Sequence, residues 1–233
     1  MSRPLAPGAE AGPLTKGPGG SAIETLFLDE FLIVVLKPAG LHTQPPASRK
    51  ETSLLDLLSR VHGPSVRIVH RLDYDASGLV VFALDRRAAG PLGAAFERHD
   101  VKRDYRALIP IPLEPGTAGI IDAPLRAVGG RTTVDPSGDP AVTHFRARRN
   151  GTFLGIAACE LEISLETGRM HQIRVHLQHR LSPILGDTKY GGRPFPRLAL
   201  HAFRLSFEHP MTGAALSFER APEWPGDHGE THA

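Results

Sequence analysis

Cysteine and long apolar runs are scarce in this chain of 233 residues, and each shortage excludes a class of protein. Cys159 is the single cysteine, so neither a disulfide framework nor a zinc site built from several cysteines can form. No apolar run reaches the length of a membrane span, and the first twenty residues lack the apolar core of a signal peptide. We therefore expect a cytoplasmic protein without a membrane partner.

An excess of charge of one sign is also missing. The 27 Lys and Arg residues nearly balance the 25 Asp and Glu residues, which leaves a formal net charge of +2. Arginine dominates the basic side, and arginine suits phosphate forks and stacking on bases better than lysine does. A GC-rich genome, which also favours Ala, Gly and Pro, explains most of this bias, so composition alone does not identify a partner.

Hydrophobic residues make up 41% of the chain, enough for a substantial core. We predict a disordered, Pro- and Gly-rich leader over 1–22, a folded domain over 23–220 and a flexible tail over 221–233. Strands are predicted over 25–28, 31–36, 79–84, 105–109, 142–148, 155–165 and 198–207, helices over 53–61, 86–98 and 170–179, and mostly loop over 110–140. The strands outnumber the helices and mostly alternate in polarity, which indicates an α+β fold with a largely antiparallel sheet.

The stretch HRLDYDASGLVVFALD, residues 70–85, places a carboxylate between two apolar runs. Asp73 follows the strand-like run 66–69 and precedes Ser77-Gly78 and the run 79–84. A lone charge at a buried position costs on the order of several kcal/mol unless it is paired, and Arg71 is a nearby countercharge. Because loops on rigid strands often carry catalytic groups, Asp73 is a candidate; an ordinary turn with a solvated Asp is the alternative.

A second polar stretch, TGRMHQIRVHLQHR over 167–180, predicts a turn followed by a helix. Helical spacing places Met170, Ile173 and Leu177 on one face, and Arg174 lies at the edge of that face. A half-buried arginine needs an acidic partner, and Asp73 is an available one.

These stretches belong to a series of motifs in a recognisable order. The series comprises KPAGL at 37–41, HRLD at 70–73 with Ser-Gly at 77–78, Lys-x-x-Tyr-x-Ala at 102–107, GRMHQIRVHL at 168–177, GDTKYGG at 186–192 and LHAFRLSFEHP at 200–210. It resembles the RluA-type family of RNA pseudouridine synthases over roughly residues 23–220. The chain departs from the family pattern at Leu36, Ala76 and the turn 41–45, which bear on loop geometry and substrate preference.

The resemblance implies a pseudouridine synthase fold, in which flanking helices accompany a mixed, mostly antiparallel sheet with the active-site cleft across its middle. It also implies that Asp73 is the catalytic carboxylate, that Arg174 is its basic partner and that Tyr105 is the active-site aromatic residue. No metal or organic cofactor is expected. Many family members carry a small S4-like RNA-binding domain at the amino terminus; a leader of this length cannot form one, so we expect a catalytic domain alone.

An RNA substrate is the expected partner, in the form of a ribosomal or transfer RNA stem-loop with an exposed uridine. Arg71 is expected to fill the space left by a flipped nucleotide or to bind a phosphate. Lys37, Lys102 and Arg169 are candidate phosphate contacts, with a solvated charge as the alternative for each. Loops 41–52 and 110–140 are the expected variable parts, and we expect a monomer without an obligate protein partner.

Two other functions are weighed against this one. A catalytically silent RNA-binding protein on the same fold would be expected to lack the carboxylate of HRLD, which is present here. A metal-dependent hydrolase would use some of the twelve histidines. His171 and His176 are five residues apart, which splays them on a helix, whereas His176 and His179 share a face but have no evident third ligand nearby.

We predict that a chelator leaves catalysis unchanged, because a single carboxylate can serve as nucleophile or base without a metal. The measurement is pseudouridine formation in unmodified RNA, folded in monovalent salt, with and without EDTA. Inhibition by EDTA together with a lack of RNA binding would favour the hydrolase.

Overall fold

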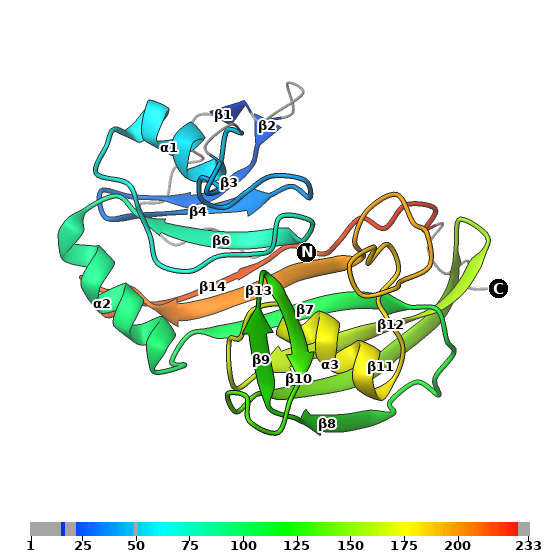
Figure 1. The fold of residues 1–233 in the computed structure, drawn as a ribbon. Helices are drawn as coiled ribbons and strands as arrows, with labels where there is room; N and C mark the ends of the chain where they lie inside the picture. The colour runs from blue at the N-terminus through cyan, green and yellow to red at the C-terminus, as the bar shows by residue number, and fades with distance from the viewer. Residues whose placement is uncertain (1–14, 17–21, 49–50, 228–233) are drawn as a thin grey trace. The chain divides into compact units, whose positions relative to one another are not determined.

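The computed structural model describes residues 15–16, 22–48 and 51–227, and Figure 1 shows their fold. Most of the predicted leader and the last six residues of the predicted tail lie outside these ranges. The chain forms two compact units: Met1–Val101 with Leu205–Arg220, and Lys102–Arg204 with Ala221–Ala233. Residues of the predicted domain over 23–220 therefore fall in both units.

The first unit contains small strands, a three-stranded antiparallel core and two helices. Its elements are β1 (Thr15–Lys16), β2 (Ala22–Ile23), β3 (Thr25–Leu28), β4 (Leu32–Lys37), α1 (Leu54–His62), β5 (Arg67–Ile68), β6 (Ser77–Ala83), α2 (Arg86–Glu97) and β14 (Ala215–Glu219). Strand β4 pairs with β3 on one side and with β6 on the other, and β5 also pairs with β6. Every residue of β6 is buried, which accounts for its continuous apolar sequence.

Both helices of the first unit begin at side-chain caps, within a residue of the starts that the sequence predicts. Ser53 and Asp56 form a reciprocal capping box at the start of α1, in which each side chain accepts a hydrogen bond from the other's backbone N–H. The Asp85 carboxylate accepts from the Arg87 N–H at 2.7 Å at the start of α2. Local side-chain chemistry therefore fixes where these helices start.

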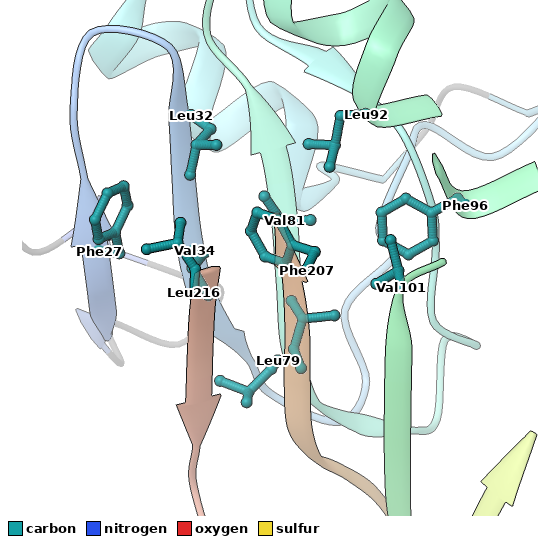
Figure 2. Packing of buried hydrophobic residues seen from close by; sticks show 11 residues of the cluster. Phe27, Leu32, Val34, Leu79, Val81, Leu92, Phe96, Val101, Phe207 and Leu216 are labelled. Atoms are coloured by element: carbon teal, nitrogen blue, oxygen red, sulfur yellow. The ribbon is translucent and has the colours of Figure 1, made fainter. Parts of the chain in front are cut away.

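The core of the first unit joins α2 to the strands. Leu92 and Phe96 of α2 pack with side chains from β3, β4, β6, β13 and β14 (Figure 2). The set comprises Phe27, Leu32, Val34, Leu79, Val81, Leu92, Phe96, Val101, Leu205, Phe207 and Leu216. Burying such side chains contributes roughly 1.5–3 kcal/mol each, so this cluster is a main source of stability for the unit.

The second unit is a four-stranded antiparallel array with one helix and a small hairpin. Its elements are β7 (Lys102–Ile109), β8 (Ala118–Asp122), β9 (Leu125–Val128), β10 (Arg131–Val134), β11 (Val142–Phe153), β12 (Ile156–Leu165) and α3 (Gln172–Arg180). The array runs in the order β7–β12–β11–β8, and α3 contacts β10 and β11. Strand β13 (Leu200–Glu208) contributes its residues up to Arg204 to this unit and the rest to the first.

The region 110–140 differs from the loop that the sequence predicts. Besides β8, it contains the hairpin β9–β10, in which Arg131 pairs with Val128 across the turn. Gly129 and Gly130 make that turn with φ angles of 57° and 75°, a conformation that glycine adopts at little cost. Because Pro and Gly are frequent around this Gly-Gly pair, the sequence predicts loop where the structure has two short strands.

Helix α3 also differs in detail from its prediction. It begins at Gln172 rather than at Met170, because His171 has a left-handed backbone with φ of 54°. Residues 172–177 are buried on every side, so the helix lacks the single apolar face that the spacing predicts. Its polar residues are therefore held by hydrogen bonds inside the unit.

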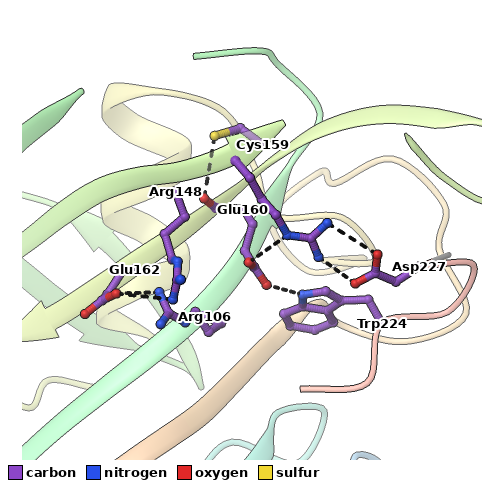
Figure 3. A network of polar contacts seen from close by, with 8 residues as sticks. Arg106, Arg148, Cys159, Glu160, Glu162, Trp224 and Asp227 are labelled. Atoms are coloured by element: carbon purple, nitrogen blue, oxygen red, sulfur yellow. Dashed lines mark hydrogen bonds and ion pairs between the residues drawn. The ribbon is translucent and has the colours of Figure 1, made fainter. Parts of the chain in front are cut away.

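The described part of the predicted tail, residues 221–227, is docked on the second unit. Trp224 is buried, and its indole N–H donates to Glu160 Oε1 at 2.6 Å (Figure 3). Arg149 bridges Glu160 and Asp227, with Nη2 at 2.5 Å from Asp227 Oδ2. The prediction of a flexible tail is therefore wrong for these residues, because one buried aromatic ring and an ion pair hold them.

The α+β prediction is confirmed, with strand pairings that are antiparallel wherever a strand register is defined. An isolated parallel bridge joins His42 to Ser53. The cleft across the sheet stays a prediction. Within the described ranges, no helix has the length and apolar character needed to cross a membrane.

We predict that Trp224→Ala lowers the free energy of unfolding by about 3–5 kcal/mol, because it removes a large buried side chain. Trp224→Phe should cost less, about 1–2 kcal/mol, since it keeps most of the packing but loses the bond to Glu160. Urea titration followed by far-ultraviolet circular dichroism measures both. Unfolding curves of Trp224→Ala that match the wild type would show that the segment adds no stability.

Candidate active site

Asp73 lies in the connection between β5 and β6 and is half-buried. Its carbonyl accepts a hydrogen bond from the Ala76 N–H at 3.2 Å, which closes a tight turn. Arg71 and Tyr74, on either side of it, are exposed. The structure thus places the predicted carboxylate at the tip of a loop between paired strands, as the sequence indicates.

Two side chains hold the start of this loop. The Thr43 hydroxyl donates to the Leu72 carbonyl at 2.9 Å and accepts from the Leu72 N–H at 3.2 Å. His70 Nε2 accepts from the Val81 N–H at 3.0 Å, and its ring stacks on Phe96 at 4.2 Å between centroids. The backbone before Asp73 is therefore fixed both to the turn 41–45 and to the core.

Lys37 holds the end of the loop. Its side chain is 0% exposed, and its ammonium donates to the carbonyls of Pro38 at 2.9 Å, Leu41 at 2.7 Å and Tyr74 at 3.1 Å. The Gly40 N–H also donates to the Tyr74 carbonyl at 2.9 Å. The KPAGL segment thus wraps around its own lysine and fastens the residue next to Asp73.

This arrangement corrects the prediction that Lys37 contacts phosphate. A fully buried ammonium that already donates to three carbonyls has no exposed surface for an RNA backbone. Burial lowers the pKa of Lys37 to about 7, whereas attraction to Asp73 and Asp75 acts in the opposite direction. Lys37 is therefore a buried amine within electrostatic reach of Asp73, a role that the sequence did not identify.

In the second unit, Arg174 forms a buried bidentate ion pair with Asp187. Nε lies 2.9 Å from Oδ2 and Nη2 lies 2.8 Å from Oδ1. Asp187, the second residue of GDTKYGG, is thus an acidic partner of Arg174, and the pairing of Arg174 with Asp73 that the sequence suggests stays a prediction. Two motifs that are separated in the sequence are thereby joined, and the guanidinium is fixed in orientation.

Tyr190, in the same motif, extends this network. Its N–H donates to Asp187 Oδ1 at 3.0 Å, and its hydroxyl accepts from the Thr132 N–H at 3.0 Å. The hydroxyl also lies 2.7 Å from His171 Nδ1. The Lys189 ammonium donates to the Gly130 carbonyl at 2.7 Å, so GDTKYGG anchors the β9–β10 hairpin at two points.

The other predicted residues of the second unit lie in contrasting environments. Tyr105 is buried in β7, opposite Ile163 of β12. Lys102 and Arg169 are exposed, and Arg169 Nε donates to the Pro140 carbonyl at 3.1 Å. Exposure leaves both cations accessible to phosphate.

His176, one of the two histidines of the metal hypothesis within α3, is part of the core. His176 Nε2 donates to the Ala123 carbonyl at 2.9 Å, and Nδ1 lies 2.9 Å from the Thr143 hydroxyl. Burial lowers the pKa of His176, which keeps the ring neutral in this position. Among the residues that the structure describes, no three His, Cys, Asp or Glu side chains gather as a metal site would require.

We predict that Lys37 makes stability depend on pH in the alkaline range. Its folded pKa of about 7 lies below the ordinary value of 10.5, so the unfolded chain binds more protons between these values and the unfolding free energy rises with pH. Lys37→Met should lack this increment, with a slope difference approaching about 1.4 kcal/mol per pH unit. Urea unfolding at a series of pH values measures it.

The matched control is Lys102→Met, which changes an exposed lysine and should leave the slope of the wild type intact. If the unfolding free energies of the wild type and Lys37→Met change with pH in the same way across the alkaline range, the lowered pKa of Lys37 is contradicted.

Comparison with known proteins places these motifs in a family. The RNA pseudouridylate synthase family matches residues 31–179. The chain is 36% identical over 220 residues to the ribosomal large subunit pseudouridine synthase D of Vibrio cholerae, which covers 84% of this chain and 66% of that protein. It is 38% identical over 215 residues to the uncharacterized RNA pseudouridine synthase YhcT of Bacillus subtilis, with 88% and 70% covered.

A likeness in structure accompanies these matches. Human RNA pseudouridylate synthase domain containing 1 superposes with a TM-score of 0.73 at 24% identity, over 91% of this chain and 86% of that one, and shares the fold. The chain spans about two thirds of the length of the Vibrio cholerae relative. On the family match and these identities, the chain belongs to the RNA pseudouridylate synthase family.

Proposed function

We propose that this chain is an RNA pseudouridine synthase that isomerises a specific uridine, with Asp73 as its catalytic carboxylate. The observation that carries the proposal is the Asp73 loop, which Lys37 and Thr43 fasten at both ends. A carboxylate held in this way is positioned for chemistry before a substrate arrives. Relatives named as ribosomal large subunit enzymes favour large-subunit ribosomal RNA over transfer RNA as the substrate.

The proposed reaction breaks the N1–C1′ bond of uridine, turns the uracil and joins C5 to C1′. C5 then loses its proton and N1 carries one, so the product has the same atoms as the substrate and nothing is oxidised. One carboxylate can perform this as nucleophile or as base. The reaction requires the carboxylate to be ionised, and Lys37 attracts Asp73 when its own amine is protonated.

The first unit also supplies the proposed means of opening the RNA. Arg71 is exposed two residues before Asp73, on the backbone that Thr43 holds at Leu72. A flipped uridine leaves a gap in the base stack, and a planar guanidinium can fill such a gap or bind the adjacent phosphate. We assign this role to Arg71.

The second unit supplies the remaining proposed contacts. Lys102 and Arg169 bind phosphate, and Tyr105 provides an aromatic face for the target uracil. Arg174 is the basic residue of the site and is oriented by its bidentate pair with Asp187. The hairpin β9–β10 exposes Arg126 and Arg131 close to its turn, which fits a role in selecting the RNA.

A catalytically silent RNA-binding protein is the second candidate. Such a protein has no use for an ionised carboxylate that is fastened at a loop tip, because phosphate groups of RNA repel it. The hydrogen bond from buried Lys37 to the Tyr74 carbonyl, which fastens this loop, favours catalysis.

We predict that Asp73→Asn lowers pseudouridine formation by about 10⁴-fold or more, because it removes the reacting carboxylate. The matched control is Asp75→Asn, which removes a half-buried carboxylate from the same loop and should retain most activity. The assay uses carbodiimide-based primer extension on an unmodified large-subunit ribosomal RNA transcript. It is repeated on total RNA from a deletion strain complemented with each variant.

Three outcomes separate the candidates. Loss of one uridine signal with Asp73→Asn and its recovery with wild type support the proposal and identify the target. A signal that survives in Asp73→Asn refutes the role of the carboxylate. Binding of the transcript by wild-type protein without any new pseudouridine supports the silent protein.

A further inference from the structure

We propose that Tyr74 is a specificity-determining residue that stacks on the nucleobase beside the target uridine. The proposal rests on the proposed function, because it gives the Asp73 loop a second contact with the RNA. Nothing in the motif series assigns a role to this position. The argument depends on the exposure, the support and the charge of the Tyr74 side chain.

Exposure distinguishes Tyr74 from the other aromatic residues. It is 41% exposed, and it is the aromatic member of the exposed large hydrophobic residues in the described ranges, beside Val61, Ile120, Val128, Leu154 and Met211. Tyr105 and Tyr190 are buried. A base that stacks on this ring, directly after the proposed catalytic carboxylate, removes apolar surface from water, and nucleobases are the partners that an RNA enzyme meets.

The ring is also held in place before any RNA binds. The Tyr74 carbonyl accepts from both Lys37 Nζ and the Gly40 N–H, which fixes its backbone. The side chain packs against the ring of His42, with 4.4 Å between centroids and 43° between planes. His42 is itself anchored, because its carbonyl accepts from the Leu54 N–H at 2.8 Å at the start of α1.

This support matters for affinity. An aromatic platform that is already ordered loses little conformational entropy when a base stacks on it, so more of the stacking energy appears as binding. The tilted ring of His42 occupies part of one side of Tyr74, and the exposed part of the ring faces solvent. The exposed part of the ring is therefore the surface on which a base can stack.

Charge selects a base rather than a phosphate as the partner of Tyr74. Asp73 and Asp75 lie on either side of it in the chain, and the phosphate backbone is repelled by two carboxylates. The neutral face of a base meets no such repulsion and can approach the ring. The base of a nucleotide next to the target uridine, rather than a phosphate group, is thus the group that Tyr74 contacts.

The experiment compares Tyr74→Phe, which keeps the ring, with Tyr74→Leu, which keeps an apolar side chain without a π face. Both act at an exposed position, and thermal unfolding confirms that each variant is folded. The RNA probes are short hairpins copied from the large-subunit ribosomal RNA segment that contains the modified uridine. In each hairpin, one nucleotide beside that uridine is replaced in turn by an abasic residue.

We expect Tyr74→Phe to retain kcat/KM within about twofold and Tyr74→Leu to lose about tenfold, as base–aromatic stacking implies. The wild type should lose a similar factor with one particular abasic hairpin, and Tyr74→Leu should lose nothing further with that hairpin. Equal losses from Tyr74→Phe and Tyr74→Leu would overturn the proposal. The proposal would also be overturned if the loss from Tyr74→Leu and the loss from the abasic residue multiplied in every hairpin.

A binding measurement keeps this test separate from catalysis. Fluorescence of 2-aminopurine at the same neighbouring position should fall on binding to the wild type and to Tyr74→Phe, and should fall less with Tyr74→Leu. If the wild type forms no pseudouridine, the proposed function fails while the fluorescence still decides the stacking. If it forms pseudouridine and the three proteins quench equally, only the role of Tyr74 fails.

Discussion

A buried ammonium organises the first unit of this protein. Taking the Lys37 charge out of water is unfavourable, and the fold offsets that cost with three carbonyl oxygens and two neighbouring carboxylates. Those same contacts tie the segment after β4 to the loop before β6. If the ammonium were absent, the carbonyls of Leu41 and Tyr74 would lose a donor and the Asp73 loop would lose one of its anchors.

The second unit solves a similar problem with a different pair of charges. Arg174 and Asp187 are both buried, and a bidentate geometry leaves little of either group unsatisfied. Tyr190 then connects this pair to the β9–β10 hairpin through the Thr132 N–H. In both units, a short motif therefore acts as an internal brace for a loop that belongs to another part of the sequence.

Features that depend on neighbouring residues could be predicted from the sequence. The capping box of Ser53 and Asp56 and the cap at Asp85 are local, and strand alternation located most strands to within a few residues. The position of Asp73 between two strands was visible for the same reason.

Features that depend on distant contacts could not. A lysine is usually solvated, so the burial of Lys37 runs against its expected environment, and its partner Tyr74 lies 37 residues away in the sequence. Finding Asp187 beside Arg174 required the fold, because spacing in the sequence does not indicate this contact. The docking of Trp224 was hidden in a polar, Pro-containing segment that resembles a tail.

The strand β13 carries a consequence for biosynthesis. Leu205 and Phe207 from its second half, and Leu216 from β14, complete the hydrophobic core of the first unit, whose other members lie before residue 102. On the ribosome, that core must wait until nearly the whole chain has been made, whereas the strands β7, β8, β11 and β12 become available earlier. The amino-terminal half is thus synthesised first and completed last, and its apolar β4 and β6 strands spend that interval without their final partners.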